Sequence, residues 1–221
     1  MENRKIRHKC WISFLIFLLM IVFSSVLSGC QIVEPEKRAF PLVAGIDWQQ
    51  GRYEIYLGMA RLAESTGQGK EGGEDQKGDE EGALLLTGTS QDEIMEVYHR
   101  TQELYLDPGH VQAVIFGSGI LGEKERMAHV LEEMETEVSL GNSAYVFGTE
   151  DLRAVMGTNG NQVESLGHYL SGIYENRTED AHPITLSQMY RELHNQGKIL
   201  QIPQITINKE QIVIENNQNN S

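Results

Sequence analysis

One glycine-rich segment has the residue spacing of a dinucleotide-binding loop. Gly117, Gly119 and Gly122 match the pattern G-x-G-x-x-G, between an apolar run predicted to be a strand and a predicted helix. In such loops an Asp or Glu about 20 residues later, at the end of a strand, hydrogen-bonds the ribose of the dinucleotide. Here Glu135 and Glu137 fall inside the predicted helix instead. We therefore interpret the segment as a plain strand-to-helix turn, expect alanine at Gly117 and Gly119 to be tolerated functionally, and expect no cofactor.

The remaining titratable residues form no complete catalytic or metal-binding pattern. His129 and Glu132, three residues apart on a predicted helix, are the nearest approach to a chelating pair, and we expect them to lie on a solvated edge. Four glutamates should be spread over the solvated polar face of that helix and should not pair for general acid–base catalysis: Glu132, Glu133, Glu135 and Glu137. Neither G-x-S-x-G nor S-x-x-K occurs. We predict that the protein is not an enzyme and holds no metal.

The N-terminus resembles the signal of exported bacterial lipoproteins. Residues 2–10 carry four basic groups, residues 11–27 are apolar, and Leu27-Ser28-Gly29-Cys30 resembles a lipobox. The resemblance implies cleavage between Gly29 and Cys30 and a diacylglyceryl thioether on the Cys30 sulfur. The alternative is an uncleaved signal anchor; either way the remaining residues would lie outside the membrane.

Composition narrows the possible partners. The chain has 221 residues, a net charge of −14, and two cysteines. This charge would repel nucleic acid, so we expect no nucleic-acid partner. Cys10 would leave with the signal and Cys30 would be lipidated, which leaves no thiol for a disulfide or a metal. The predicted organisation is a signal peptide (1–29), a lipidated tether (30–38), a folded domain (39–215) with a disordered acidic loop (64–82), and a polar tail (216–221).

Hydrophobic periodicity predicts a mixed α/β sheet flanked by helices. The strands are expected at 40–47, 52–60, 83–88, 111–116, 144–147, 204–208 and 211–215. The helices are expected from the Ser90 cap through Leu104, at 123–137, 150–156 and 162–175, and after a capping box at Thr185 and Gln188.

Several segments, in order, resemble the N-terminal domain of the Ger(x)C family, the lipoprotein C subunits of GerA-type spore germinant receptors. They are LVAGID at 42–47, YEIYL at 53–57, GHVQAVIFG at 109–117, TLSQMY at 185–190 and IPQI at 202–205. The likeness runs from residue 27 to about residue 207. It implies a membrane-anchored protein that acts in germination by contact with polytopic receptor subunits, with its domain on the extracytoplasmic face of the cell or inner spore membrane. The alternative is an envelope solute-binding or scaffold lipoprotein unrelated to germination.

Overall fold

The computed structural model describes residues 34–59, 82–137, 139–159, 161–163, 165–176, 183–209 and 211–215. The chain divides into two units, Met1–Glu36 and Lys37–Ser221, and the second holds the folded domain. The predicted signal, Gly29, Cys30, nearly all of the predicted acidic loop and the tail lie outside the described residues. Among the described residues, no helix has the length and apolarity needed to cross a membrane.

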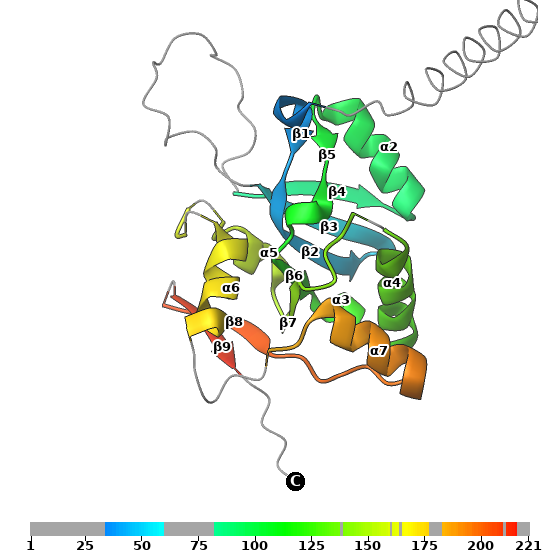
Figure 1. Cartoon of the computed structure of the whole chain (residues 1–221), viewed down its shortest axis with the longest axis vertical. Coiled ribbons are helices and arrows are strands. Elements are labelled where there is room, and N and C mark those ends of the chain that lie inside the picture. The colour runs from blue at the N-terminus through cyan, green and yellow to red at the C-terminus, as the bar shows by residue number, and fades with distance from the viewer. Residues whose placement is uncertain are drawn as a thin grey trace, which may run out of the picture. The chain divides into compact units, whose positions relative to one another are not determined.

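A seven-stranded mixed sheet forms the centre of the domain (Figure 1). Its strands, in spatial order, are β4 (Leu84–Gly88), β3 (Arg52–Met59), β2 (Pro41–Gln49), β6 (Ala113–Phe116), β7 (Tyr145–Thr149), β8 (Gln204–Asn208) and β9 (Gln211–Glu215). Strands β2, β6, β7 and β8 run parallel, while β3 and β9 pair antiparallel to their neighbours. The predicted mixed α/β fold class is therefore confirmed.

The β2–β3 hairpin follows from its turn residues. Gln49 pairs with Arg52, which leaves a two-residue turn. Both turn residues have positive φ, 51° at Gln50 and 82° at Gly51. Two successive left-handed residues match the right-handed twist of the flanking strands, and glycine adopts this conformation without steric cost.

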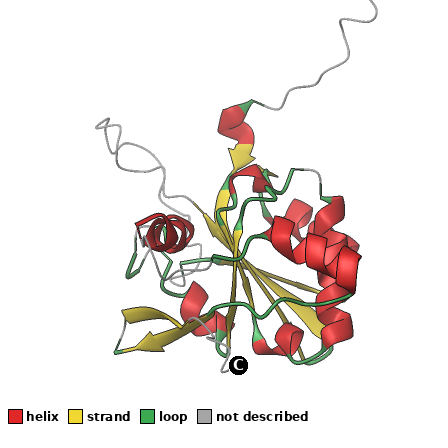
Figure 2. Ribbon diagram, turned by 60° about the horizontal axis from the view of Figure 1, so that its bottom comes forward, coloured by secondary structure: helices red, strands yellow, loops and turns green. Residues whose placement is uncertain are grey.

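Helices cover both faces of the sheet (Figure 2). One face packs against α2 (Gln91–Thr101), α3 (Ser118–Leu121), α4 (Lys124–Thr136) and α7 (Leu186–Gln196). The other face packs against α5 (Leu152–Met156) and α6 (Leu166–Asn176). Alternation along β6 supplies both cores: Val114 and Phe116 contact the first layer, Ala113 and Ile115 the second, and all four are fully buried. The predicted capping box of α7 is present, with Thr185 and Gln188 bonding reciprocally.

Two helix boundaries differ from the prediction by three residues or more. The α2 helix ends at Thr101, and Leu104 lies beyond it, because the Tyr98 hydroxyl donates to the Leu104 carbonyl and draws the chain into a short strand, β5 (Tyr105–Leu106). This strand pairs in parallel with β1 (Arg38–Ala39).

The α6 helix begins at Leu166 rather than at residue 162. The Asn159 side chain accepts a hydrogen bond from the Leu166 N–H at 2.9 Å, and the amides of Gln162 and Val163 donate to the Thr158 carbonyl. A side-chain acceptor competes here with the first helical turn, a local effect that hydrophobic periodicity does not register.

Candidate functional site

The glycine-rich segment is a strand-to-helix turn in which a backbone amide binds a carboxylate of the same chain. Gly117 follows β6, and its amide donates to the Ile46 carbonyl of the neighbouring β2. The next residue of β2, Asp47, is 4% exposed. Its Oδ1 accepts hydrogen bonds from the Gly119 and Trp48 amides, each at 2.8 Å, and its Oδ2 accepts from the Gln49 side chain. The amide that would face a phosphate in a nucleotide-binding loop therefore binds Asp47.

Both glycines are required by this contact. A Cβ on Gly117 would lie 2.2 Å from Cγ of Asp47, and a Cβ on Gly119 would lie 2.0 Å from the Trp48 carbonyl oxygen. The structure supports the interpretation of a plain strand-to-helix turn, in which Gly117 precedes the short helix α3. Alanine at either position would clash with β2 and should destabilise the fold, which is separate from the expectation that it is tolerated functionally.

His129 and Glu132 both lie on the exposed side of α4, which agrees with the expected solvated edge. The His129 Nε2 lies 3.5 Å from Glu133, one residue further along α4, and both partners are solvent-accessible. Within the described parts of the chain, no cluster of three or more His, Cys, Asp or Glu side chains could hold a metal ion.

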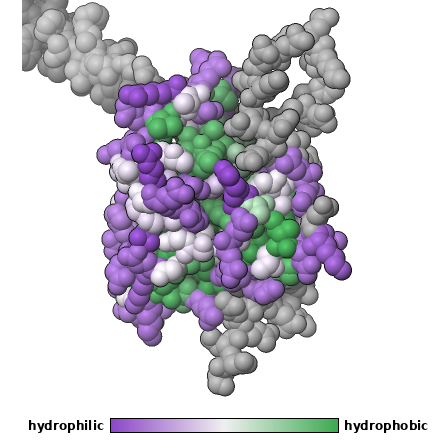
Figure 3. Space-filling view, turned by 180° about the vertical axis from the view of Figure 1, so that it is seen from behind, coloured by the Kyte–Doolittle hydropathy of each residue, from purple (hydrophilic) through white to green (hydrophobic). Residues whose placement is uncertain are grey.

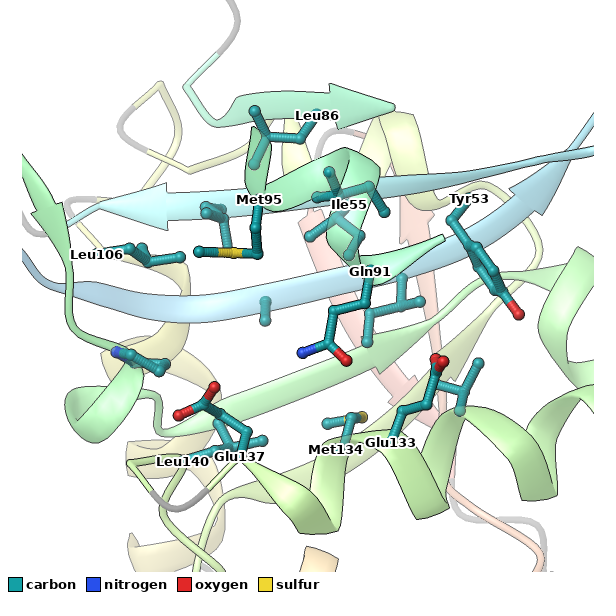
Figure 4. Close-up of a pocket in the computed structure, with 16 residues that line it drawn as sticks. Tyr53, Ile55, Leu86, Gln91, Met95, Leu106, Glu133, Met134, Glu137 and Leu140 are labelled. Atoms are coloured by element: carbon teal, nitrogen blue, oxygen red, sulfur yellow. The ribbon is translucent and has the colours of Figure 1, made fainter. Parts of the chain in front are cut away.

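An apolar groove lies between α2 and α4, over a strip of the sheet that neither helix covers (Figure 4). Its floor is formed by Ala44 and Ile46 of β2 and by Ile55 and Leu57 of β3. The walls come from both helices and from the loop around β5, with Ile94, Met95, Val130, Met134, Leu106 and Leu140. The groove is open to solvent, and its cavity volume is about 160 Å³.

The polar groups of the groove stand at its rim. The polar side chains of the lining are Glu133 of α4, Glu137 at the C-cap of α4, Gln91 of α2 and Tyr53 of β3. Burial raises the pKa of the Tyr53 hydroxyl, and the nearby Glu133 carboxylate raises it further. Arg126 lies 4.8 Å above the ring of Trp48, which itself packs edge-on against Tyr53. The groove thus has an apolar floor and a rim that is acidic along α4.

Sequence reasoning missed this groove. Met134 has the spacing of the apolar face of the helix expected at 123–137, and Ile46 and Ile55 lie within strands expected at 40–47 and 52–60. The signal that could have found it is Ala44 beside Gly45: a small side chain where two helices diverge leaves the sheet uncovered. Glu133 and Glu137 are the carboxylates of the lining, and no serine, cysteine, histidine or lysine among the described residues lines the groove beside them.

The fold is an α/β domain with an open, mostly apolar groove. The sequence matches the family described as the spore germination protein N-terminal domain over residues 31–207, most of the chain and nearly all of the folded domain. The chain belongs to this family. Comparison with curated proteins and with solved structures finds no match. The family is one of germinant receptor subunits and not a known enzyme family, which supports the resemblance to C subunits of germinant receptors.

Proposed function

We propose that this protein is a lipid-anchored, C-subunit-like component of a germinant receptor, and that its groove binds an apolar segment of a membrane-embedded receptor subunit. The family match supports the role in germination. The observation that carries the contact is the uncovered strip of sheet between α2 and α4, floored by Ala44, Ile46, Ile55 and Leu57.

The chemistry of the groove selects an apolar chain with basic neighbours. Its floor offers carbon atoms and no hydrogen-bonding side chain, so an occupant gains by burying apolar surface, at about 25 cal/mol per Å². Glu133 and Glu137 stand along one wall, where Lys or Arg beside the apolar segment would complement them. An amphipathic helix laid between two helices is a common mode of such recognition.

The anchor proposed for this module is the Cys30 thioether left after cleavage following Gly29. Each buried methylene of an acyl chain contributes roughly 0.8 kcal/mol, so two chains would hold the domain at the membrane although the residues from Cys30 onward, 14 basic and 31 acidic, carry a net charge of −17. The domain would then lie on the extracytoplasmic face. Mass spectrometry of the mature N-terminus tests this step alone: it should show residue 30 first and carrying a diacylglyceryl mass.

The partner contact is tested by pull-down of the tagged protein from solubilised spore membranes. The wild type should recover polytopic receptor subunits, and Glu137→Lys, an exposed reversal at the groove rim, should reduce that recovery about tenfold or more. The Cys30→Ala variant cannot be lipidated, so it should not be held at the membrane and should recover no receptor subunits. Tyr169→Lys on α6, which lies across the sheet from the groove, is the matched control and should recover them normally.

An envelope solute-binding lipoprotein is the alternative outcome of the same experiment. Its signature would be recovery of no receptor subunit, with lipidation intact and a small apolar molecule retained by the purified domain. That result would reject the proposed contact with a receptor subunit but would not affect the assignment of the chain to the family.

A further inference from the structure

The domain has a built apolar tip at the place where the N-terminal tether joins it. Leu104 is 41% exposed and Tyr105 is 53% exposed, the largest exposures among the large apolar side chains of the described residues. Tyr105 pairs with Arg38 and Leu106 with Ala39 in the small parallel sheet of β1 and β5. The tip formed by Leu104 and Tyr105 is therefore adjacent to the first residues of the folded domain.

The tip is held in place by several bonds. The hydroxyl of Tyr98, a side chain 1% exposed, donates to the Leu104 carbonyl at 2.9 Å. The Arg38 guanidinium donates to the Asp107 carboxylate at 2.6 Å, and the Asp107 amide donates to the Ala39 carbonyl at 3.0 Å. These bonds fix both sides of the Leu104–Tyr105 pair, so its exposure is not that of a loose loop.

The charge near the tip differs from that of the whole chain. Residues 34–39 and 100–107, around β1 and β5, carry three basic side chains (Lys37, Arg38 and Arg100) and four acidic ones (Glu34, Glu36, Glu103 and Asp107), so their charges nearly balance. The chain as a whole carries −14. An anionic membrane would therefore repel this end less than the rest of the surface, and Figure 3 also shows apolar atoms exposed among hydrophilic ones here.

We propose that Leu104 and Tyr105 form a membrane-contacting tip that seats the domain against the lipid surface. Cys30 precedes Arg38 by eight residues, a length of at most about 28 Å when extended. A folded domain of this size is roughly 40 Å across, so a tether from β1 holds the tip nearest the membrane. Tyrosine, with an apolar ring and a polar hydroxyl, suits the boundary between lipid and water.

This inference rests on the proposed anchor, and it adds an orientation that the anchor alone does not set. With the tip in the lipid boundary, β8 and β9 point away from the membrane, since they lie at the other end of the domain from β1 and β5 (Figure 1). The groove opens beside the tip, because Leu106 of β5 lines it. A membrane subunit would therefore meet the groove close to the bilayer.

Site-directed spin labelling of the lipidated full chain tests the tip. Tyr105→Cys and the matched control Tyr169→Cys each supply a single free thiol, because the thioether occupies the Cys30 sulfur and Cys10 leaves with the signal. The labelled proteins are bound to vesicles of phosphatidylethanolamine and phosphatidylglycerol. Position 105 should lose collisions with a water-soluble nickel complex and gain collisions with oxygen, while position 169 keeps the accessibility it has in detergent-free solution.

Equal exposure of both positions to water, on protein whose lipidated N-terminus is verified by mass, would overturn the tip and leave the anchor standing. An unmodified Cys30 would overturn the anchor and, with it, the seating proposed here. A second pair of variants, Leu104→Asp and Tyr169→Asp, checks the same surface without a label: the first should increase dissociation from the vesicles and the second should not.

Discussion

The Asp47 Oδ1 accepts a hydrogen bond from the Gly119 amide at 2.8 Å, across 72 residues of sequence. The bond ties the end of β2 to the single helical turn α3, which precedes α4. On the other side of that turn, Arg126 of α4 donates to the Gly119 carbonyl at 2.9 Å. A single residue thus connects the sheet strip that floors the groove with the helix that forms one of its walls.

Replacing this carboxylate should weaken the domain. We expect Asp47→Asn to lower the free energy of unfolding by about 1–3 kcal/mol, because charge-assisted bonds to two amides become neutral ones or are lost in a buried place. Urea unfolding followed by circular dichroism measures this change. Asp92→Asn, at an exposed site in the first turn of α2, is the control; an equal and small effect of both variants would contradict the assignment.

Alanine at Gly119 should be more damaging than alanine at a loose glycine. The added Cβ would approach the Trp48 carbonyl oxygen to 2.0 Å, so β2 and the turn must separate, at a cost of roughly 2 kcal/mol or more. Gly141→Ala is the matched control, since its added Cβ meets nothing closer than 3.9 Å. Thermal unfolding should show a clear loss for Gly119→Ala and little change for Gly141→Ala; similar melting temperatures would refute the close packing.

These glycines show what sequence can predict and where it stops. The strand before Gly117, the helix after it and the mixed sheet all follow from apolar periodicity, and two strand ranges, at β8 and β9, agree to the residue. The sequence does not predict that the Gly119 amide binds the Asp47 carboxylate, because Asp47 and Gly119 are distant in sequence and meet only when β2 and β6 pair in parallel. Periodicity reports which side chains are buried, but not which strand lies next to which.

Acid should release β1 from β5. The Arg38 guanidinium holds the pKa of the Asp107 carboxyl below its ordinary value of 3.8, and the Gly109 amide adds to this. A lowered folded-state pKa contributes stability above the unfolded value, and that contribution is lost as the pH falls through the folded-state pKa. The difference in stability between wild type and Asp107→Asn should therefore be present at pH 6 and shrink below about pH 4.

Hydrogen exchange at the Asp107 amide, which donates to Ala39, measures the same effect locally. Its protection should fall with Asp107→Asn at neutral pH. Unchanged protection in that variant would show that β1 is held without the ion pair.

High pH should lower the folding stability of the domain through the Tyr190 hydroxyl. Burial, together with a smaller contribution from the Glu135 carboxylate, raises the pKa of this hydroxyl to about 12. The unfolded phenol ionises near pH 10, so wild type should lose up to about 3 kcal/mol relative to Tyr190→Phe between pH 10 and pH 12.

At neutral pH the same variant should be as stable as wild type or slightly more stable, since the buried hydroxyl has no hydrogen-bond partner among the described residues. Urea titrations at pH 8 and pH 11 separate the two effects. A large loss of stability at pH 8 would reveal a partner for the hydroxyl and contradict this account.

The groove marks a second limit of sequence reasoning. Met134 has the spacing of a core residue on α4, and Met95 lies on the inward side of α2, so both look buried in sequence. They are half-exposed because α2 and α4 stand over different strands and leave Ala44 and Ile55 between them. The separation of two helices depends on sheet order, which no local pattern encodes.

Photo-crosslinking from within the groove tests the central claim most directly. A benzoylphenylalanine side chain replaces Met134, on the groove wall, or Tyr169, on α6, in the lipidated protein in spore membranes. Irradiation should join position 134 to a polytopic receptor subunit, through a peptide that mass spectrometry shows to be apolar with Lys or Arg beside it, while position 169 gives no such product. Crosslinks from position 169 to that subunit and none from position 134 would contradict the groove as the receptor contact.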